Sequence, residues 1–373
     1  MITTRYTTTQ SSFRIGELLS KPGEYAYGKF HALQLPNGSE EFLPVIIAHG
    51  RSSGPVLWIT AGIHGDEYTG IGVIHRLLTP ELLTDLRGAV VSVPTLNPAG
   101  LRVGERAPYY LKKLDPNRLF PEPEDGHYAE DERPRLLEGA YARLFEEIKR
   151  TASVVVDLHN YSILSIPFAF RDPVYYRNET ELTGARELHR QTNELLESFG
   201  FTIINEYASR SYLKRNLHRS VSGAAQLVAK IPAFTVELGG YLTIDPTIAD
   251  AAAVGLRNLM RHMGMLPGDP EPLQGIPILS LDHPVRRMAA VIVPETGIVR
   301  FLIRPGMILK QGDPVALLSD IYGRPLGKEG GLLRVEESGI VIGLSQGAAF
   351  YEGDHLLSLA VRDDADPILK YPY

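Results

Sequence analysis

Between residues 55 and 264, the chain alternates short apolar runs with longer stretches in which apolar residues recur at helical spacing. Short apolar runs are typical of buried strands, and the longer stretches indicate amphipathic helices. We expect strands at 56–60, 88–94, 153–158, 200–204 and 232–238, and helices at 68–79, 134–150, 178–198, 216–229 and 246–263. This alternation predicts an α/β fold with a mixed, mainly parallel sheet and helices on both faces.

The pattern changes on either side of this region. Residues 1–54 indicate a strand region, with a strand expected at 42–48, and a Pro- and Gly-rich linker begins at Leu266. Beyond the linker, short β-like runs are separated by Gly and Pro, without a strong helical period. These runs lie at 287–293, 298–303, 314–318, 332–336 and 339–344. We therefore divide the chain into residues 1–266 and a small all-β, barrel-sandwich-like domain at 267–373.

Two functions are open for the segment 267–373. Turns such as Arg304-Pro305-Gly306 resemble those of lipoyl- and biotinyl-type β-sandwiches, which carry a modified lysine at a hairpin tip. Lys328 lies in a Leu-Gly-Lys-Glu-Gly-Gly context that is a poor match for such a lysine. We therefore interpret this segment as an active-site lid or an assembly module.

Composition narrows the functional classes. The net charge of −6 argues against a nucleic-acid partner, and the absence of cysteine excludes disulfides, thiolate metal sites and a cysteine nucleophile. The N-terminus lacks an apolar signal core, and no apolar run approaches the roughly 18 residues of a membrane span. We expect a cytoplasmic protein without membrane contact, and leave a homo-oligomer open. Any metal must bind to histidine and carboxylate side chains, which suits a hydrolytic Zn²⁺.

His64 and Glu67 are candidate metal ligands. They follow the apolar run 55–60 and precede a helical stretch, so they lie at the carboxyl end of a predicted strand, where α/β folds place their sites. His127 and Glu130 have the same spacing but lie in an acidic loop, and we interpret them as solvated surface residues.

His159 is the candidate third ligand, because it ends the predicted strand 153–158. A hydrolytic zinc needs three protein ligands and one open position for water. Asp157 stands two residues earlier, on the same face of a continuing strand, and could orient the histidine. The alternative is a strand-terminal histidine that caps a neighbouring loop.

Glu237 lies inside a strongly apolar strand and precedes Gly239 and Gly240. A buried carboxylate is costly unless it is paired or belongs to a site, so Glu237 is a candidate general base. The alternative is a buried glutamate satisfied by a backbone amide or an arginine.

The irregular stretch 96–131 is unusually long for a compact domain, and loops of this length are usually functional. It contains Arg106, Asn117 and Arg118, which could supply positive charge for an oxyanion and an anchor for a substrate carboxylate. The alternative for Arg106 is a surface charge on a loop.

Together these residues resemble the succinylglutamate desuccinylase/aspartoacylase family, a branch of the zinc carboxypeptidase-like fold, over about residues 45–265. The motifs that carry the resemblance are His64-Gly65-Asp66-Glu67, Asn97-Pro98, Arg106, Asp115-Pro116-Asn117-Arg118-Leu119-Phe120, Asp157-Leu158-His159 and Glu237-Leu238-Gly239. Asp66, Pro116 and the Pro121-Glu122 pair depart from the residues usual in the family, and they flank the predicted site, so they leave the substrate identity open.

The resemblance implies one zinc ion per chain, bound by His64, Glu67 and His159. It further implies that Glu237 activates the water and Arg106 polarises the scissile carbonyl. It also implies that a substrate carboxylate is held by Asn117 and Arg118.

The expected function is therefore zinc-dependent hydrolysis of the amide bond of a small N-acyl amino acid. Alternatives are an N-acetyl-diaminobutyrate deacetylase of the ectoine-degradation type, a short-peptide carboxypeptidase, and a metal-free binding protein on the same scaffold. The basic segment Ser211–Arg219 could be a specificity wall of the site or a solvated helix start.

Overall fold

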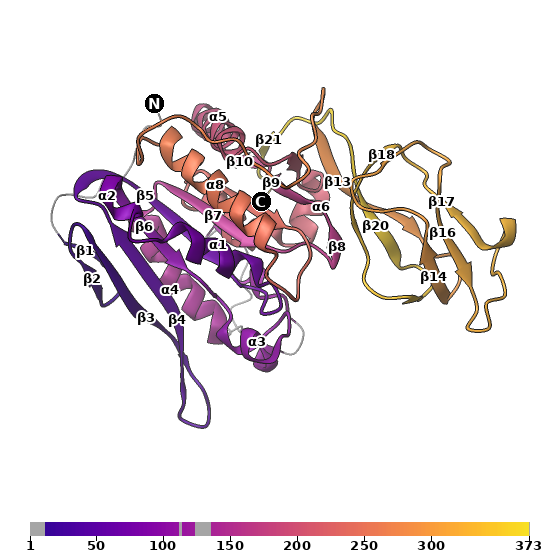
Figure 1. Cartoon of the computed structure of the whole chain (residues 1–373), viewed down its shortest axis with the longest axis horizontal. Coiled ribbons are helices and arrows are strands. Elements are labelled where there is room, and N and C mark those ends of the chain that lie inside the picture. Colours follow the sequence, from indigo (N-terminus) through magenta and orange to yellow (C-terminus); the bar gives the residue numbers. More distant parts are fainter. Residues whose placement is uncertain (1–11, 112–113, 124–135, 373) are drawn as a thin grey trace.

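The centre of the fold is a parallel sheet. The computed structural model describes residues 12–111, 114–123 and 136–372 (Figure 1). The strands β5 (Ser52–Ala61), β6 (Arg87–Val93), β7 (Val154–His159) and β12 (Ala233–Leu238) lie in the order β6-β5-β7-β12 and pair in parallel. These four confirm strands predicted from the apolar runs, and their buried residues form the middle of the core.

Antiparallel strands flank this parallel centre, so the sheet is mixed, as predicted. On one side β4 (Glu40–His49) pairs antiparallel with β6 and with β3 (Glu24–Gln34). On the other side β9 (Pro167–Arg171) pairs antiparallel with β12 and parallel with β11 (Ile203–Asn205). An apolar run reports burial but not strand direction, so the sequence does not show which strands are antiparallel.

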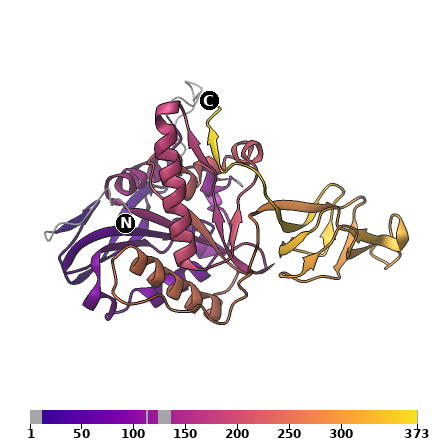
Figure 2. The ribbon, with the colours of Figure 1, turned by 90° about the horizontal axis from the view of Figure 1, so that it is seen from above.

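Helices cover both faces of the sheet, as predicted. On one face α1 (Thr69–Leu77), α5 (Leu182–Phe199) and α8 (Pro246–His262) pack in a common hydrophobic core (Figures 1 and 2). On the other face α4 (Leu136–Thr151) and α7 (Val221–Leu227) pack around Trp58 and its neighbours.

The helix predicted at 216–229 is interrupted. Asn216 adopts a left-handed conformation with φ 53°, a 3₁₀ turn follows at Leu217–Arg219, and the side chain of Ser220 then accepts a hydrogen bond from the backbone of Gly223. A serine that caps a new helix start in this way ends the earlier turn, so two short segments replace one helix.

Short elements complete the residues up to the linker. These are β1 (Phe13–Ile15), β2 (Leu18–Ser20), α2 (Leu82–Asp85), α3 (Pro98–Val103), β8 (Leu164–Ser165), β10 (Val174–Tyr176), α6 (Ser209–Lys214) and 3₁₀ turns at Tyr109–Leu111, Pro116–Arg118 and Glu179–Glu181. None of the described helices is long and apolar enough to cross a membrane.

After the linker, the described elements are strands and one 3₁₀ turn. They are β13 (Val285–Ile292), β14 (Gly297–Phe301), β15 (Ile308–Leu309), β16 (Pro314–Ser319), β17 (Leu332–Arg334), β18 (Gly339–Leu344), β19 (Ala349–Phe350), β20 (His355–Arg362), β21 (Ile368–Lys370) and the turn Glu329–Gly331. The part of the chain from β13 to β20 projects from one end of the molecule (Figures 1 and 2).

Four of these strands, β13, β15, β18 and β20, nevertheless continue the main sheet, whereas β14, β16, β17 and β19 form a separate four-stranded sheet. The first of them, β13, pairs in parallel with β11 at Asn205 and Arg286, and β18 pairs with β8. The chain then returns to the main body, where β21 pairs in parallel with β10. Residues 267–373 are therefore tied to residues 1–266 by strand pairing at several places.

Gly65 allows the turn after β5 to lie directly against α3. A Cβ atom at this position would lie 2.1 Å from the backbone carbon of Gly100. The backbone nitrogen of Gly65 donates to the carbonyl of Arg106 over 3.1 Å, so the same close approach joins the His64 turn to the irregular stretch.

We expect Gly65→Ala to destabilise the protein by about 1–3 kcal/mol, the range for inserting atoms into a packed region, because the neighbouring atoms are backbone. Gly184→Ala is the matched control, since Gly184 lies in α5 and a Cβ there would meet nothing within 4 Å. It should be neutral or stabilising, because alanine favours helix. Urea unfolding of both variants measures the difference, and equal stabilities would contradict the packing argument.

Candidate metal centre and its cavity

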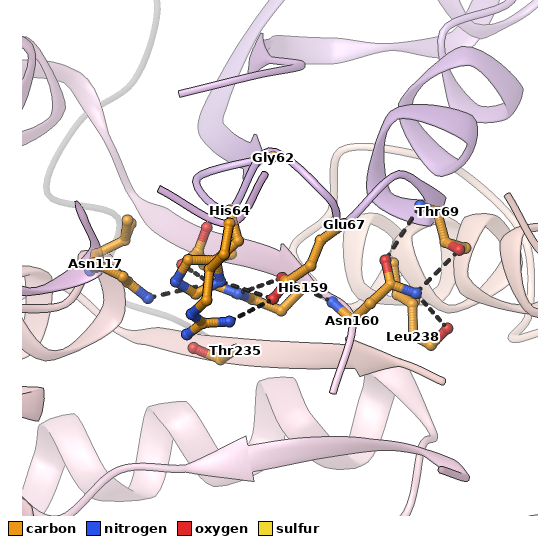
Figure 3. A network of polar contacts seen from close by, with 12 residues as sticks. Gly62, His64, Glu67, Thr69, Asn117, His159, Asn160, Thr235 and Leu238 are labelled. Atoms are coloured by element: carbon orange, nitrogen blue, oxygen red, sulfur yellow. Dashed lines mark hydrogen bonds and ion pairs between the residues drawn. The ribbon is translucent and has the colours of Figure 1, made fainter. Parts of the chain in front are cut away.

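Three predicted ligands meet beyond the carboxyl ends of two neighbouring parallel strands. In the register of β5 and β7, Ala61 is opposite Leu158, so His64 lies in the turn after β5 and His159 is the last residue of β7. The Nδ1 atoms of His64 and His159 lie 2.7 and 2.9 Å from the two carboxylate oxygens of Glu67 (Figure 3). All three side chains are buried, and one donor atom from each lies within 4.8 Å of the others.

Two aspartates hold the outer sides of the histidine rings. The Nε2 atom of His159 lies 2.8 Å from Asp157, and the Nε2 atom of His64 lies 3.0 Å from Asp115. Asp157 also accepts a hydrogen bond from the hydroxyl of Thr60 over 2.6 Å. A carboxylate behind a ligand histidine fixes the orientation of the ring. Asp157 thus occupies the position that its predicted role requires, and Asp115 makes the same contact although it was not singled out as a site residue.

Asn160 fixes the position of Glu67, and sequence reasoning missed it. Its backbone nitrogen donates to Glu67 Oε2 over 3.0 Å, and its side-chain nitrogen donates to the hydroxyl of Thr69 and to the carbonyl of Leu238 (Figure 3). One asparagine therefore connects the end of β7 with α1 and β12. Its place directly after the Asp-Leu-His motif was the available signal.

The charges of the cluster suit a cation. Burial opposes ionisation of Glu67, but His64 and His159 outweigh it and hold the pKa of this carboxyl well below its usual range. Burial likewise disfavours the charged form of His159, yet Asp157 and Glu67 raise its pKa well above the ordinary value. A bound metal would replace the histidine proton, so binding should release a proton.

The donor set fits a metal ion of the hydrolytic type. Two imidazoles and one carboxylate, buried and convergent, are a known three-ligand arrangement of catalytic zinc sites. Among the described residues, these three form the group of histidine and acidic side chains that could hold a metal. The predicted pair His127 and Glu130 lies outside the described residues.

Glu237 lies beside the cluster. In the pairing of β12 with β7 it is opposite His159, and its Oε2 atom is buried without a hydrogen-bond partner. Burial raises the pKa of this carboxyl, and Glu67 raises it further against the opposing effect of His159. A carboxyl that does not strongly favour its charged form can both accept and return a proton, as general base catalysis requires.

Arg106 and Arg118 both lie at this site. Arg106 is half-exposed, and its guanidinium donates to Glu67 and Asp115 over 3.1 Å each. Arg118 is three-quarters buried and donates from Nε to the carbonyl of Arg215 over 2.8 Å, with Asp115 at 3.7 Å. The two guanidinium groups therefore converge on one aspartate.

Asn117 is more constrained than its predicted role suggested. Its side-chain oxygen accepts from the backbone nitrogen of Val221, at the start of α7, over 3.0 Å. Its side-chain nitrogen lies 3.2 Å from His159 Nε2. The amide of Asn117 thus contacts both the start of α7 and the candidate ligand His159.

All of these predicted residues except Asp157 line one cavity of about 140 Å³. Its further walls include Tyr161, Phe170, Asp172, Glu206, Leu217, Ser222, Thr235 and Arg287. Leu217 belongs to the segment Ser211–Arg219, so this segment does border the site. A larger cavity of about 320 Å³ beside α5 contains none of the predicted site residues.

Arg287 brings the C-terminal strands into the site. It comes from β13, and its guanidinium forms an ion pair with Glu206 and lies 4.4 Å from the ring centre of Phe170. Glu206 is buried, and the exposed fraction of the Arg287 side chain is 13%. Arg287 stands beside Arg286 at the start of the β-run predicted at 287–293, so no signal in the sequence distinguished it from a surface charge.

Comparisons with known proteins identify a related family. The family model described as the succinylglutamate desuccinylase/aspartoacylase catalytic domain matches residues 53–263. The chain is 27% identical over 298 residues to the N-alpha-acetyl-L-2,4-diaminobutyric acid deacetylase of Halomonas elongata, covering 78% of this chain and 79% of that protein. It is 32% identical over 123 residues to the succinylglutamate desuccinylase of Yersinia enterocolitica, covering 32% of this chain and 36% of that protein.

Solved structures share the fold. A succinylglutamate desuccinylase/aspartoacylase from Rhodobacter sphaeroides aligns with a TM-score of 0.69 at 22% identity, over 91% of this chain and 96% of that chain. The product-bound ectoine utilisation protein EutE (DoeB) from Ruegeria pomeroyi aligns with a TM-score of 0.67 at 20% identity, over 91% of this chain and 94% of that chain.

The buried pair of Arg287 and Glu206 should couple the C-terminal strands to the cavity. We expect Arg287→Met to lower the free energy of unfolding by about 3–5 kcal/mol, because it leaves a buried carboxylate without its partner. The double variant with Glu206→Gln should recover part of this loss. Arg190→Met removes an exposed pair with Glu187 and should change stability by no more than about 1 kcal/mol. Similar losses for the two single variants would contradict a buried coupling.

Proposed function

The chain belongs to the succinylglutamate desuccinylase/aspartoacylase family, and we propose that it hydrolyses the amide bond of a small N-acyl amino acid at a zinc site formed by His64, Glu67 and His159. The observation that carries this proposal is the convergence of these three donors in one cavity with Glu237. The named relatives are deacylating hydrolases, which agrees with a reaction that releases an acyl group from an amine.

Zinc is the proposed metal because the donors are nitrogen and oxygen atoms of two histidines and one carboxylate, and the chain has no cysteine. When bound, zinc supplies a Lewis acid that makes water nucleophilic near neutral pH and polarises a carbonyl. Asp157 and Asp115 would keep the Nδ1 atoms of the two histidines directed at the metal, since they contact the opposite ring nitrogens.

Glu237 is the proposed general base. Its free carboxylate oxygen would accept a proton from the attacking water and then pass this proton to the leaving nitrogen. The departing amine is a poor leaving group unless it is protonated, so the same carboxyl would serve both halves of the reaction. Its buried position would keep bulk water from competing for the proton.

The two arginines would bind negative charge at different stages. Arg106, at the rim beside Glu67, would stabilise the oxyanion that develops from the scissile carbonyl, a charge that grows in the transition state. Arg118 would hold the carboxylate of the amino acid, because a guanidinium can form two parallel hydrogen bonds to it. Asn117 would support this arrangement by holding the start of α7 and contacting His159.

One specific alternative is an N-acetyl-diaminobutyrate deacetylase. The relative of that name matches over most of both chains, whereas the succinylglutamate desuccinylase matches over a third of this chain. A short-peptide carboxypeptidase is less favoured, because the named relatives act as deacylases. The intact set of ligands, base and arginines gives no support to a metal-free binding protein.

Zinc-loaded protein should hydrolyse acetyl or succinyl amino acids, with about one Zn²⁺ per chain, and removal of the metal by a chelator should abolish turnover. His159→Ala should lose both metal and activity. His75→Ala, which changes an exposed histidine on α1, should lose neither. Metal analysis and product release measure these outcomes, and turnover that persists after complete metal removal would contradict the zinc mechanism.

Glu237→Gln should show whether Glu237 acts as a general base or as a metal ligand. The amide keeps the shape of the side chain but cannot accept the proton, so we expect kcat to fall by roughly 10²–10⁴ while KM changes little. Zinc content should stay at the wild-type level. Glu67→Gln should behave differently and lose metal first, with activity falling as a result. If Glu237→Gln loses zinc or turns over normally, another residue is the base.

A further inference from the structure

Asp172 lies in the wall of the cavity and has no role in the mechanism above. It follows β9, and its side chain is buried. Its Oδ2 atom accepts a hydrogen bond from the hydroxyl of Ser222 over 2.6 Å, and the hydroxyl of Tyr212 also donates to this carboxyl. The partners of Asp172 are therefore neutral hydroxyl groups.

No ion pair to Asp172 is formed among the residues that the structure describes, in contrast to the neighbouring carboxylate. Glu206 lines the same part of the cavity, but Arg287 neutralises it. A buried carboxylate that lacks a cation is unfavourable for folding, because desolvation of its charge is not compensated. Asp172 therefore stands out as an acidic group in the cavity wall that a bound cation would complete.

The position of Asp172 relative to the proposed base determines where a bound cation would lie in the cavity. The hydroxyl of Ser222 also lies 3.1 Å from that of Thr235, so it joins Asp172 to β12. Thr235 and Glu237 are two residues apart on one strand, so they face the same side and lie roughly 6.6 Å apart along it. Asp172 is thus linked to the strand of the base through Ser222 and Thr235, and both carboxyl groups line the same cavity of about 140 Å³, which suits a small substrate.

We propose that Asp172, supported by Ser222, binds a positively charged ammonium group on the substrate, so that the preferred substrates are N-acyl derivatives of short diamino acids. The inference rests on the proposed function, because it places the ammonium relative to an amide at the metal centre. Arg118 would hold the carboxylate of the same molecule, so the cavity would bind the cationic and the anionic group of one substrate at separate points.

The electrostatics of Asp172 agree with this assignment. Burial and the nearby Glu206 together raise the pKa of Asp172 to about 7, against the opposing effects of Ser222, Arg287 and Tyr212. An ammonium group in contact with the carboxyl would favour its ionised form and lower the pKa again. A neutral or anionic side chain would gain nothing from this group.

The test compares three substrates on zinc-loaded, full-length protein: N-α-acetyl-2,4-diaminobutyrate, the neutral N-acetyl-2-aminobutyrate and the anionic N-acetylaspartate. The wild type should prefer the cationic substrate in kcat/KM. Asp172→Asn keeps the size of the side chain and removes its charge. It should lower kcat/KM for the cationic substrate about tenfold to a hundredfold and leave that for the neutral substrate within about threefold, as expected for loss of a charged hydrogen bond.

The ratio of the two kcat/KM values is the decisive readout, since partial unfolding lowers both equally and leaves the ratio unchanged. Ser222→Ala keeps the carboxylate and should reduce the ratio by a smaller factor. Asp364→Asn removes an exposed carboxylate outside the cavity and should leave the ratio at the wild-type value.

Two results would overturn the assignment of Asp172. One is a wild type whose kcat/KM for the neutral or the anionic substrate equals its kcat/KM for the cationic substrate. The other is an Asp172→Asn variant with an unchanged ratio, which would make Asp172 a structural hydrogen-bonding residue. Absence of hydrolysis of any N-acyl amino acid would instead overturn the proposed function itself, and the ammonium subsite with it.

Discussion

The parallel pairing of β5 with β7 is the constraint on which the rest of the site depends. It brings the ends of two strands that are far apart in the sequence to the same edge of the sheet, so that one glutamate can contact both histidines. Neighbouring features maintain this meeting point: the close approach at Gly65 and the hydrogen bonds of Asn160. A shift of β7 by one residue would turn His159 to the opposite face of the sheet.

The sequence predicted the centre of the molecule better than its edges. The strands β5, β6, β7 and β12 are nearly continuous apolar runs, and burial on both faces produces that pattern. The short strand β9 was not predicted, and its antiparallel pairing with β12 depends on contacts distant in the sequence. Propensity could not reveal the left-handed turn at Asn216 either, because asparagine adopts this conformation only in certain contexts.

The candidate site likewise contains some residues that the sequence predicted and others that it did not. The positions of His64, Glu67, His159 and Glu237 followed from strand ends and from a carboxylate in an apolar run. The residues that sequence reasoning did not single out, Asp172, Glu206 and Arg287, come from segments that meet only in the folded chain. Their contribution depends on which charges neutralise each other, and such pairing cannot be derived without three-dimensional contacts. Arg106 and Arg118 are an example, because the sequence does not show that both side chains approach Asp115.

The way in which the C-terminal strands are attached has a mechanical consequence. The chain leaves the main body through β13, which pairs with β11, and returns to it through β21, which pairs with β10. A segment joined to the main body at two places is restrained against rotation about either connection alone. Its low-energy motion should therefore be a twist of the continuous sheet, with the smallest displacement near the anchors. Arg287 lies next to the first anchor, so the charged wall of the cavity should behave as a rigid boundary while the distant hairpins move.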